Sequence, residues 1–351
     1  MFFRTRMPLA ATAMLGFAAV FSTPASSADV VLRFGSINTE NTAPYDQVLL
    51  PFAKAVEEES EGRIEVQLKP LGGYGKPAEL FTMVEKGTIE MAASVQGYHP
   101  GRFPQSSVME LPFMFESSIA GTSAMLQLHK EGLLDKDYAS VKVLGLYVLP
   151  PYPIFTTGKK IQSVKDFRGL RMRSPSTTVG VALAKLGAVP LGIPLNMIGD
   201  TIASGYVDAI AYGWDSTTTT KGAGGKNLVD QLKVVIDARL AAPALMIVMN
   251  RSTWDSMPAD LKKIVEKHAA DLSMGSARIR EAQEAVTKKK LLSNPRYTAL
   301  AFNDQQRAEL LAVTAPAVAE WKANMAKLGI DGEKLYARAK ELIQQYKVAA
   351  K

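Results

Sequence analysis

Residues 63–95, RIEVQLKPLGGYGKPAELFTMVEKGTIEMAASV, carry the pattern that decides the fold. Residues 64–68 alternate apolar with polar or charged side chains, which is the period of a β-strand. A glycine-rich turn follows, then a short helical stretch over 77–87, and the apolar run 89–95 predicts another strand. A strand, a helix and a strand in this order predict a parallel pair joined by a crossover helix.

The flanking sequence extends this pattern in both directions. Upstream, an apolar strand ends near Asn38, and an amphipathic helix is expected over 44–61. Downstream, the proline-broken run 141–155 leaves the first unit, and a similar alternation of strands and helices follows. The segment 240–250 predicts one more buried strand, and 258–292 predicts a helix of ~45 Å that could brace two units. The predicted fold class is α/β, with mostly parallel sheets flanked by helices.

The N-terminus predicts export. Arg4 and Arg6 precede an apolar run over 8–21, and small residues follow it, which is typical of a secretory signal peptide. The run is short for a membrane span. A remaining chain of roughly 320 residues usually divides into two lobes with a cleft between them. The expected organisation is a signal peptide over 1–28, a first lobe over 29–150 plus about 240–280, and a second lobe over 151–239 plus about 281–351, which includes the C-terminal helices.

Composition excludes several classes of protein. The chain has no cysteine, so a disulfide scaffold, a thiol nucleophile and a cysteine-bound metal are excluded. The formal net charge is +7, but the basic residues are scattered, and the lysine run 288–290 is typical of a solvated helix face rather than a nucleic-acid site. We therefore expect no nucleic-acid partner, and the mild positive charge suits a small anionic ligand.

Signals for catalysis are weak. His99, His129 and His268 lie far apart in the sequence without metal-ligand spacing, and no HExxH or GxSxG motif is present. Residues 222–227 resemble a phosphate-binding loop only superficially. A Ser-His-Asp site stays open, but nothing indicates one. We expect no enzyme activity, no cofactor and no metal site.

Two arginines interrupt the strand predicted at 169–175. A buried guanidinium costs several kcal/mol unless an anion meets it. Pro175 ends strand pairing directly after Arg173, so Arg173 lies at the carboxyl end of the strand, where ligands bind in open parallel sheets. Its planar fork suits a carboxylate. An internal salt bridge or a solvated edge position is the alternative, and Arg171 is expected to be structural or solvated.

Aromatic residues mark two more candidate positions. Tyr212, Trp214 and Asp215 follow another predicted strand, and Tyr98 lies in the glycine- and proline-containing loop 97–104. Aromatic walls with a few polar groups are typical of small-molecule sites. A core position for the first group and a surface loop for Tyr98 are the alternatives.

These motifs together resemble those of a known family. ELPFMF at 110–115, DFRGLRMRSP at 166–175, GYVDA at 205–209 and WDSMPADL at 254–261 are similar to segments of the DctP-type solute receptors of TRAP transporters, and the resemblance extends from about Val30 to the end of the chain. It implies a two-lobed periplasmic binding protein fold of type II-like architecture, braced by a long helix. In that family the second arginine of the GLRMRSP signature holds the ligand carboxylate, which implies this role for Arg173.

The resemblance also implies further ligand-binding positions. They follow strand ends or the signature itself: Asn38, Val95, Tyr98, Pro153, Pro175, Ser176, Leu195, Asn196, Tyr212 and Trp214. This chain departs from the family pattern at three positions, and each departure removes a polar partner for a ligand. Met197 replaces a glutamate, Tyr212 replaces an asparagine, and Pro153 replaces an arginine that some members carry. An apolar site penalises a second carboxylate. The expected ligand is a monocarboxylate with a hydrophobic or aromatic body.

The implied partners are the small and large membrane subunits of a TRAP permease, and the implied receptor is a periplasmic monomer. Two alternatives are a solute receptor of another importer class and an exported enzyme acting on an anionic substrate.

Overall fold

The computed structural model describes Met1 and residues 28–222 and 225–349. The predicted signal peptide over 1–28 lies almost entirely outside the described residues. Among the residues that are described, no helix has the length and apolar character needed to cross a bilayer.

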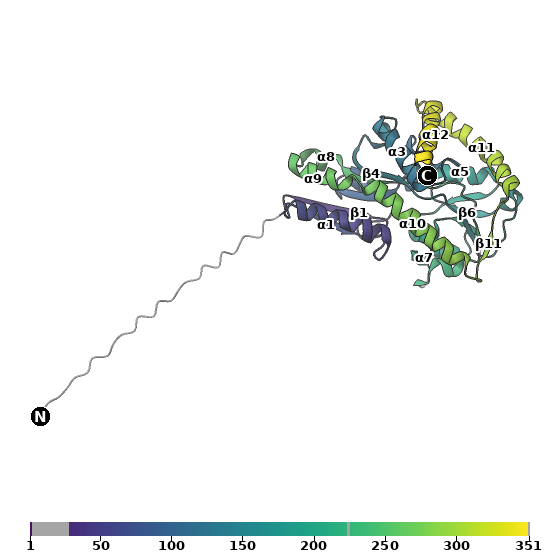
Figure 1. Ribbon diagram of the computed structural model, residues 1–351, viewed down its shortest axis with the longest axis horizontal. Helices are drawn as coiled ribbons and strands as arrows, with labels where there is room; N and C mark the ends of the chain where they lie inside the picture. The colour runs from purple at the N-terminus through teal and green to yellow at the C-terminus, as the bar shows by residue number, and fades with distance from the viewer. Residues whose placement is uncertain (2–27, 223–224, 350–351) are drawn as a thin grey trace.

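The first lobe is built on a five-stranded sheet (Figure 1). Its order is β2-β1-β3-β10-β4, with bounds Ile64–Lys69, Val30–Ser36, Met91–Val95, Ala244–Asn250 and Val141–Val148. β1 pairs in parallel with both β2 and β3, which confirms the parallel unit predicted from residues 63–95. β10 is antiparallel to both of its neighbours.

The second lobe is built on a six-stranded sheet of order β11-β9-β5-β8-β6-β7. The bounds in that order are Thr298–Leu300, Val234–Ile236, Ile154–Thr156, Ala209–Ala211, Arg171–Ser174 and Val189–Gly192. β6 lies between β7 and β8 and is parallel to both, whereas β5 is antiparallel to β8 and β9. Each sheet is therefore parallel except for one strand, which confirms the predicted α/β architecture of mostly parallel sheets.

The strands that run against their sheets are the ones reached by crossing between lobes. Residues 149–153 lead from β4 to β5, and residues 237–243 lead from β9 back to β10. The two crossing segments are bonded to each other: the Leu149 N–H donates to the Pro243 carbonyl (3.2 Å) and the Tyr152 N–H to the Ala241 carbonyl (2.9 Å). They run side by side as a short connection between the lobes, in which neighbouring prolines have no N–H to contribute.

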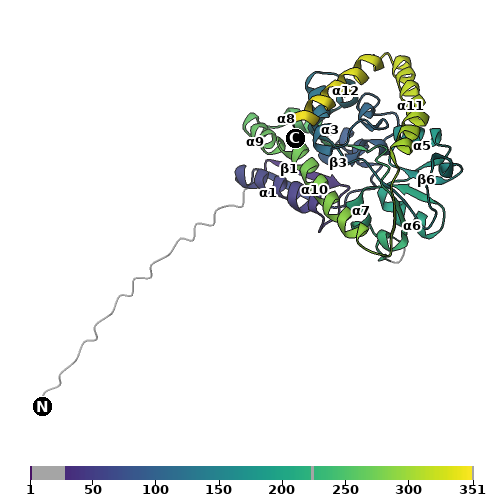
Figure 2. The ribbon, with the colours of Figure 1, turned by 45° about the vertical axis from the view of Figure 1, so that its right-hand side comes forward.

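Helices cover the faces of both sheets (Figures 1 and 2). Their bounds are α1 Leu50–Glu59, α2 Leu80–Glu85, α3 Ser118–Lys130, α4 Asp135–Tyr138, α5 Thr177–Lys185, α6 Ile198–Ala203, α7 Trp214–Thr219, α8 Arg251–Ser256, α9 Ala259–Ala269, α10 Leu272–Leu292, α11 Asp304–Lys327 and α12 Gly332–Ala349. A turn of π-helix, Tyr45–Leu49, precedes α1, so the helix expected over 44–61 is present.

α10 is the predicted brace. It contacts α3 and β4 in the first lobe and α7 in the second, and Figure 1 shows it running from beside α9 to α7. With 21 residues it is roughly 30 Å long. The expectation of one nearly continuous helix over 258–292 needs a correction, because the chain turns after Ala269. Lys267 and His268, at the end of α9, both bind the Glu59 carboxylate of α1 (2.7 and 2.8 Å), which ties this helix end to the first lobe.

The last two helices contact different lobes. α11 packs against α5 in the second lobe, whereas α12 packs mainly against α3 in the first. The contacts of α11 agree with the second-lobe assignment of 281–351, and those of α12 point to the first lobe. The boundaries of the lobes therefore remain a proposal, with α12 as the segment to reassign.

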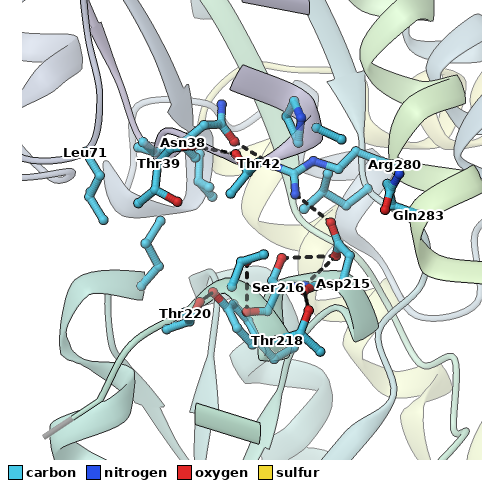
Figure 3. A pocket seen from close by; sticks show the side chains of 18 of the residues that line it. Asn38, Thr39, Thr42, Leu71, Asp215, Ser216, Thr218, Thr220, Arg280 and Gln283 are labelled. Carbon is cyan, nitrogen blue, oxygen red and sulfur yellow. Dashed lines mark hydrogen bonds and ion pairs between the residues drawn. The ribbon is translucent and has the colours of Figure 1, made fainter. Parts of the chain in front are cut away.

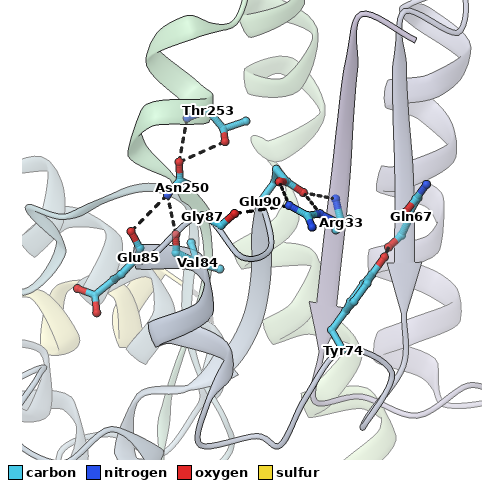
Figure 4. A network of polar contacts seen from close by, with 9 residues as sticks. All are labelled: Arg33, Gln67, Tyr74, Val84, Glu85, Gly87, Glu90, Asn250 and Thr253. Atoms are coloured by element: carbon cyan, nitrogen blue, oxygen red, sulfur yellow. Dashed lines mark hydrogen bonds and ion pairs between the residues drawn. The ribbon is translucent and has the colours of Figure 1, made fainter. Parts of the chain in front are cut away.

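Polar contacts hold the returning strand β10 in the first lobe (Figure 4). The Asn250 side chain accepts from the Thr253 N–H (2.9 Å), which caps α8, and donates to the Val84 carbonyl (2.7 Å). Nearby, the Arg33 Nε donates to Glu90 (2.8 Å). Residues far apart in the sequence are thereby joined into one unit.

Candidate functional site

Arg173 occupies a buried position at the end of β6. Its backbone is paired with Leu191 of β7 and Ile210 of β8, and the residue is only 1% exposed. The strand ends directly afterwards, because Ser176 caps α5 by accepting from the Val179 N–H (3.2 Å). The guanidinium therefore lies at the carboxyl end of an interior parallel strand, and the strand end was predicted.

The guanidinium of Arg173 is held by neutral groups. Its Nε donates to the Ile193 carbonyl (2.9 Å) and its Nη1 to the Ala211 carbonyl (2.9 Å), while Nη2 reaches the Tyr98 hydroxyl at 3.4 Å. Within the described part of the chain, no carboxylate forms an ion pair with it. A guanidinium has five N–H donors, so two remain, one on each terminal nitrogen. This geometry leaves a two-pronged donor for an anion.

Arg171, two residues earlier, has a different environment. It is exposed, and its Nε and Nη2 both donate to the Asp208 carboxylate (3.1 Å each). This guanidinium holds the pKa of Asp208 at about 2. Arg171 is thus exposed in an ion pair, as expected, whereas the ligand-binding role of Arg173 stays a prediction.

Three tyrosines surround the Arg173 guanidinium. The Tyr212 ring lies 5.3 Å from its central carbon, and the rings of Tyr152 and Tyr212 meet edge to face at 6.1 Å. Burial raises the pKa of Tyr212 to about 12. Burial also raises the pKa of Tyr98, and the positive charge of Arg173 opposes that rise. All three hydroxyls are therefore protonated near neutral pH.

A cavity of about 320 Å³ lies in front of these tyrosines, between the lobes (Figure 3). Arg173 does not line it but lies directly behind Tyr98 and Tyr212, which do. Figure 3 shows first-lobe residues Asn38, Thr39, Thr42 and Leu71 facing second-lobe residues Ser216, Thr218 and Thr220. An apolar cavity of about 150 Å³ holds benzene, so this volume suits a molecule with one ring and polar substituents.

A second arginine reaches the cavity from α10. The Nη1 of Arg280 donates to Asp215 Oδ2 (2.8 Å), and its Nη2 donates to Asn38 Oδ1 (2.6 Å). Arg280 thus joins the end of β1 in the first lobe to the start of α7 in the second. Sequence reasoning did not identify Arg280 or its neighbour Gln283. One signal could have identified Arg280: it lies on the same buried face of α10 as the small residues Ser276 and Ala277.

The structure brings most predicted site residues together. Asn38, Val95, Tyr98, Leu195, Asn196 and Tyr212 line the cavity. Four others lie elsewhere. Pro153 is buried in the crossing segment, and Pro175 and Ser176 pack against Gly97 beside a separate hollow. Trp214 is 1% exposed and packs edge to face on Phe155, so it belongs to the core.

One of the departures used to predict the ligand also lies away from the cavity. Met197 is 51% exposed and does not line it, so its replacement of a glutamate carries no information about the ligand.

Another cavity, of about 300 Å³, lies between the 96–110 segment, α5 and α11. Phe103, Trp321 and Glu110 line it, with no lysine or arginine among its lining residues. Burial raises the pKa of Glu110 to about 7. This cavity therefore lacks the positive charge that an anionic ligand needs.

Two α/β lobes joined by two crossing segments, with a cavity between them and a buried arginine that has no ion pair among the described residues, define a solute-binding protein of the two-lobed type. The chain belongs to the bacterial extracellular solute-binding protein family 7, DctP, whose model matches residues 34–324. The predicted resemblance is confirmed.

Individual relatives agree with this assignment. The C4-dicarboxylate-binding periplasmic protein DctP of Rhodobacter capsulatus is 25% identical over 259 residues, covering 71% of this chain and 74% of the relative. A TRAP solute-binding protein of an unidentified marine microbe, solved with metahydroxyphenylacetate, is 27% identical with a TM-score of 0.82 and covers 90% of this chain and 99% of its own. A TRAP solute-binding protein from Rhodoferax ferrireducens T118, solved with copurified benzoate, is 26% identical with a TM-score of 0.82. The match covers 92% of this chain and 99% of that protein.

Proposed function

We propose that this protein is the periplasmic receptor of a TRAP transporter, that it binds an aromatic monocarboxylate between its lobes, and that it delivers this ligand to the small and large membrane subunits of the permease. The observation that carries the proposal is the guanidinium of Arg173, which is buried, held by two backbone carbonyls, and without a carboxylate partner among the described residues. A ligand carboxylate supplies the missing charge.

The walls of the cavity support an aromatic body for this ligand. Tyr98, Tyr152 and Tyr212 present ring surface around the Arg173 end, and Val95 and Leu195 add aliphatic surface. Rings stack or meet edge to face on such walls, which adds binding energy beyond burial alone. The two similar proteins named with metahydroxyphenylacetate and benzoate support the same ligand class.

The electrostatics at Arg280 disfavour a second carboxylate on the ligand. Among the described residues around the cavity, Arg173 has no ion pair, Arg280 is offset by Asp215 within 2.8 Å, and the exposed Lys221 has Asn227 as its partner. A second carboxylate directed at Arg280 would lose its hydration and meet a cation that is already paired, at a net cost.

Capture follows from the position of the site between the lobes. The carboxylate binds Arg173 of the second lobe, while the ring contacts residues of both lobes. A ligand that makes these contacts only when the lobes are together stabilises the closed arrangement. The crossing segments 149–153 and 237–243 form the hinge.

Calorimetric titration tests the proposal. We expect phenylacetate, benzoate or 3-hydroxybenzoate to bind at least tenfold more tightly than succinate or sialic acid, with one site per chain and no turnover. Tighter binding of succinate would refute the ligand class. Conversion of a bound acid to product would instead favour an exported enzyme.

A further inference from the structure

The charge of Arg280 is balanced by Asp215, but several of its N–H groups have no hydrogen-bond partner among the described residues. It is 9% exposed, and its Nη1 and Nη2 each have one partner, Asp215 and Asn38. Its Nε is buried without a partner in the described part of the chain. Of five N–H groups, three therefore remain, including one on each terminal nitrogen. Unpaired buried donors of this kind are costly, so an acceptor in the cavity is favoured.

Most of the acceptor capacity of the partner carboxylate, Asp215, is already used. Asp215 Oδ2 accepts from Arg280, and Oδ1 accepts both from the Ser216 N–H (2.7 Å) and from the Ser216 hydroxyl (3.1 Å). The pair as a whole is neutral. What it offers the cavity is N–H donors without net charge.

The side chain of Gln283 lines the cavity close to Arg280 in Figure 3, and no hydrogen bond to it is found among the described residues. A primary amide both donates and accepts. Arg280 and Gln283 together can therefore satisfy a group that accepts one hydrogen bond and donates another, which describes a hydroxyl.

The two arginines lie within reach of one small molecule. The charges of both arginines act on Tyr152: burial raises the pKa of this tyrosine well above its usual value, and the charges of Arg173 and Arg280 both oppose that rise. Tyr152 and Arg280 line the same cavity of about 320 Å³, directly in front of Arg173. A single-ring acid with its carboxylate at Arg173 therefore directs its ring toward Arg280.

We propose that Arg280, with Gln283, recognises a neutral hydroxyl on the ring of the bound acid. This inference rests on the proposed function and adds a ligand feature to it. The preferred ligand is a hydroxylated aromatic monocarboxylate, and neither the unsubstituted acid nor one with a second carboxylate makes the same hydrogen bonds.

The test compares three acids of one shape: phenylacetate, 3-hydroxyphenylacetate and 3-carboxyphenylacetate. Calorimetry on the wild-type chain should show the hydroxy acid binding about tenfold more tightly than phenylacetate, and the dicarboxylate binding more weakly than either. In Arg280→Met and in Gln283→Leu, the ratio of the first two affinities should fall toward one. Because Arg280→Met leaves Asp215 unpaired, the double variant Arg280→Met with Asp215→Asn is measured beside it.

Arg278→Met is the matched control. Arg278 lies on the same helix but is exposed and pairs with Asp271 (2.6 Å), so the affinity ratio should not change. If phenylacetate and the hydroxy acid lose affinity equally in all the Arg280 and Gln283 variants, the role of these residues is purely structural and the inference is overturned. A wild-type ratio of the two affinities near one would overturn it as well. If phenylacetate and the hydroxy acid both fail to bind wild type, the proposed function itself has failed.

Discussion

Gly97 of the first lobe lies directly against Ser176 of the second. An added Cβ at Gly97 would lie 2.3 Å from the Ser176 Cβ and 2.6 Å from the Pro175 carbonyl oxygen. Contacts this short are not tolerated, so only glycine allows the lobes to approach as they do.

Gly97→Ala should therefore impede closure. We expect a loss of ligand affinity of tenfold or more with little change in the free energy of unfolding, because each lobe keeps its own core. Titration and urea unfolding measure the two quantities. Gly158→Ala is the control, since an added Cβ there meets nothing within 4 Å. Unchanged affinity in Gly97→Ala would show that ligand binding does not require this approach.

Removal of the Arg173 guanidinium should abolish tight binding. Arg173→Ala is expected to cost roughly 2–5 kcal/mol of binding free energy, the range for one partner of a buried charge pair. Arg173→Lys should also bind more weakly, because an ammonium lacks the planar fork. Arg171→Ala, in the same strand, should bind as wild type does, since its partner is Asp208. Similar calorimetric affinities for the Arg173 and Arg171 variants would contradict the site.

The Tyr98 hydroxyl should contribute to the contact between lobes. It accepts from the Leu195 N–H (3.1 Å) and from Arg173 (3.4 Å), so Tyr98→Phe should lower the free energy of unfolding by about 1 kcal/mol. Tyr152→Phe is matched to it, because no hydrogen bond to the Tyr152 hydroxyl is found among the described residues. Urea titration compares the two variants, and equal effects would exclude a special role for Tyr98.

Glu284 on α10 should make stability depend on pH. Burial raises its pKa from 4.5 to about 8; Asp215 and Asp237 add to the rise, and Arg239 and Lys288 oppose it. Between pH 4.5 and about pH 8 the Glu284 carboxyl group is protonated in the folded chain and ionised in the unfolded chain. The free energy of unfolding therefore falls as the pH rises through this range. Glu284→Gln should match wild type near pH 4 and exceed it by on the order of 4 kcal/mol at pH 8.

Urea unfolding from pH 4 to 9 checks this prediction. Glu309→Gln is the control, because Glu309 is exposed on α11. If the curves of wild type and Glu284→Gln run parallel over this range, Glu284 does not hold a proton in the folded chain.

Much of the fold was predictable because its elements have clear periodicity. The alternation in β2 and the apolar runs of β3 and β10 all mark elements found in the structure. The neighbouring strands β9 and β11 have three residues each, too few for a period to show. Just before the break between α9 and α10, Lys267 and His268 contact Glu59 of α1, and the local sequence does not reveal this contact.

The site was predictable where chain direction alone places a residue. Arg173 and Tyr212 follow from strand ends, because the carboxyl ends of parallel strands meet at one edge. Trp214 was not predictable in this way, since the orientation of its ring depends on Phe155 in a neighbouring strand. Arg280 lies on a helix more than 100 residues from Arg173 in sequence, and only the packing of α10 across both lobes brings it to the cavity.

The interior place of β10 in the first sheet also limits the order in which this protein can fold during synthesis. β10 lies between β3 and β4, yet it is made only after residues 154–236 of the second sheet have emerged. Until then the nascent first sheet lacks an interior strand, and β3 and β4 each lack a backbone partner on one side. The growing chain therefore cannot complete its first sheet until at least two thirds of its length has been synthesised.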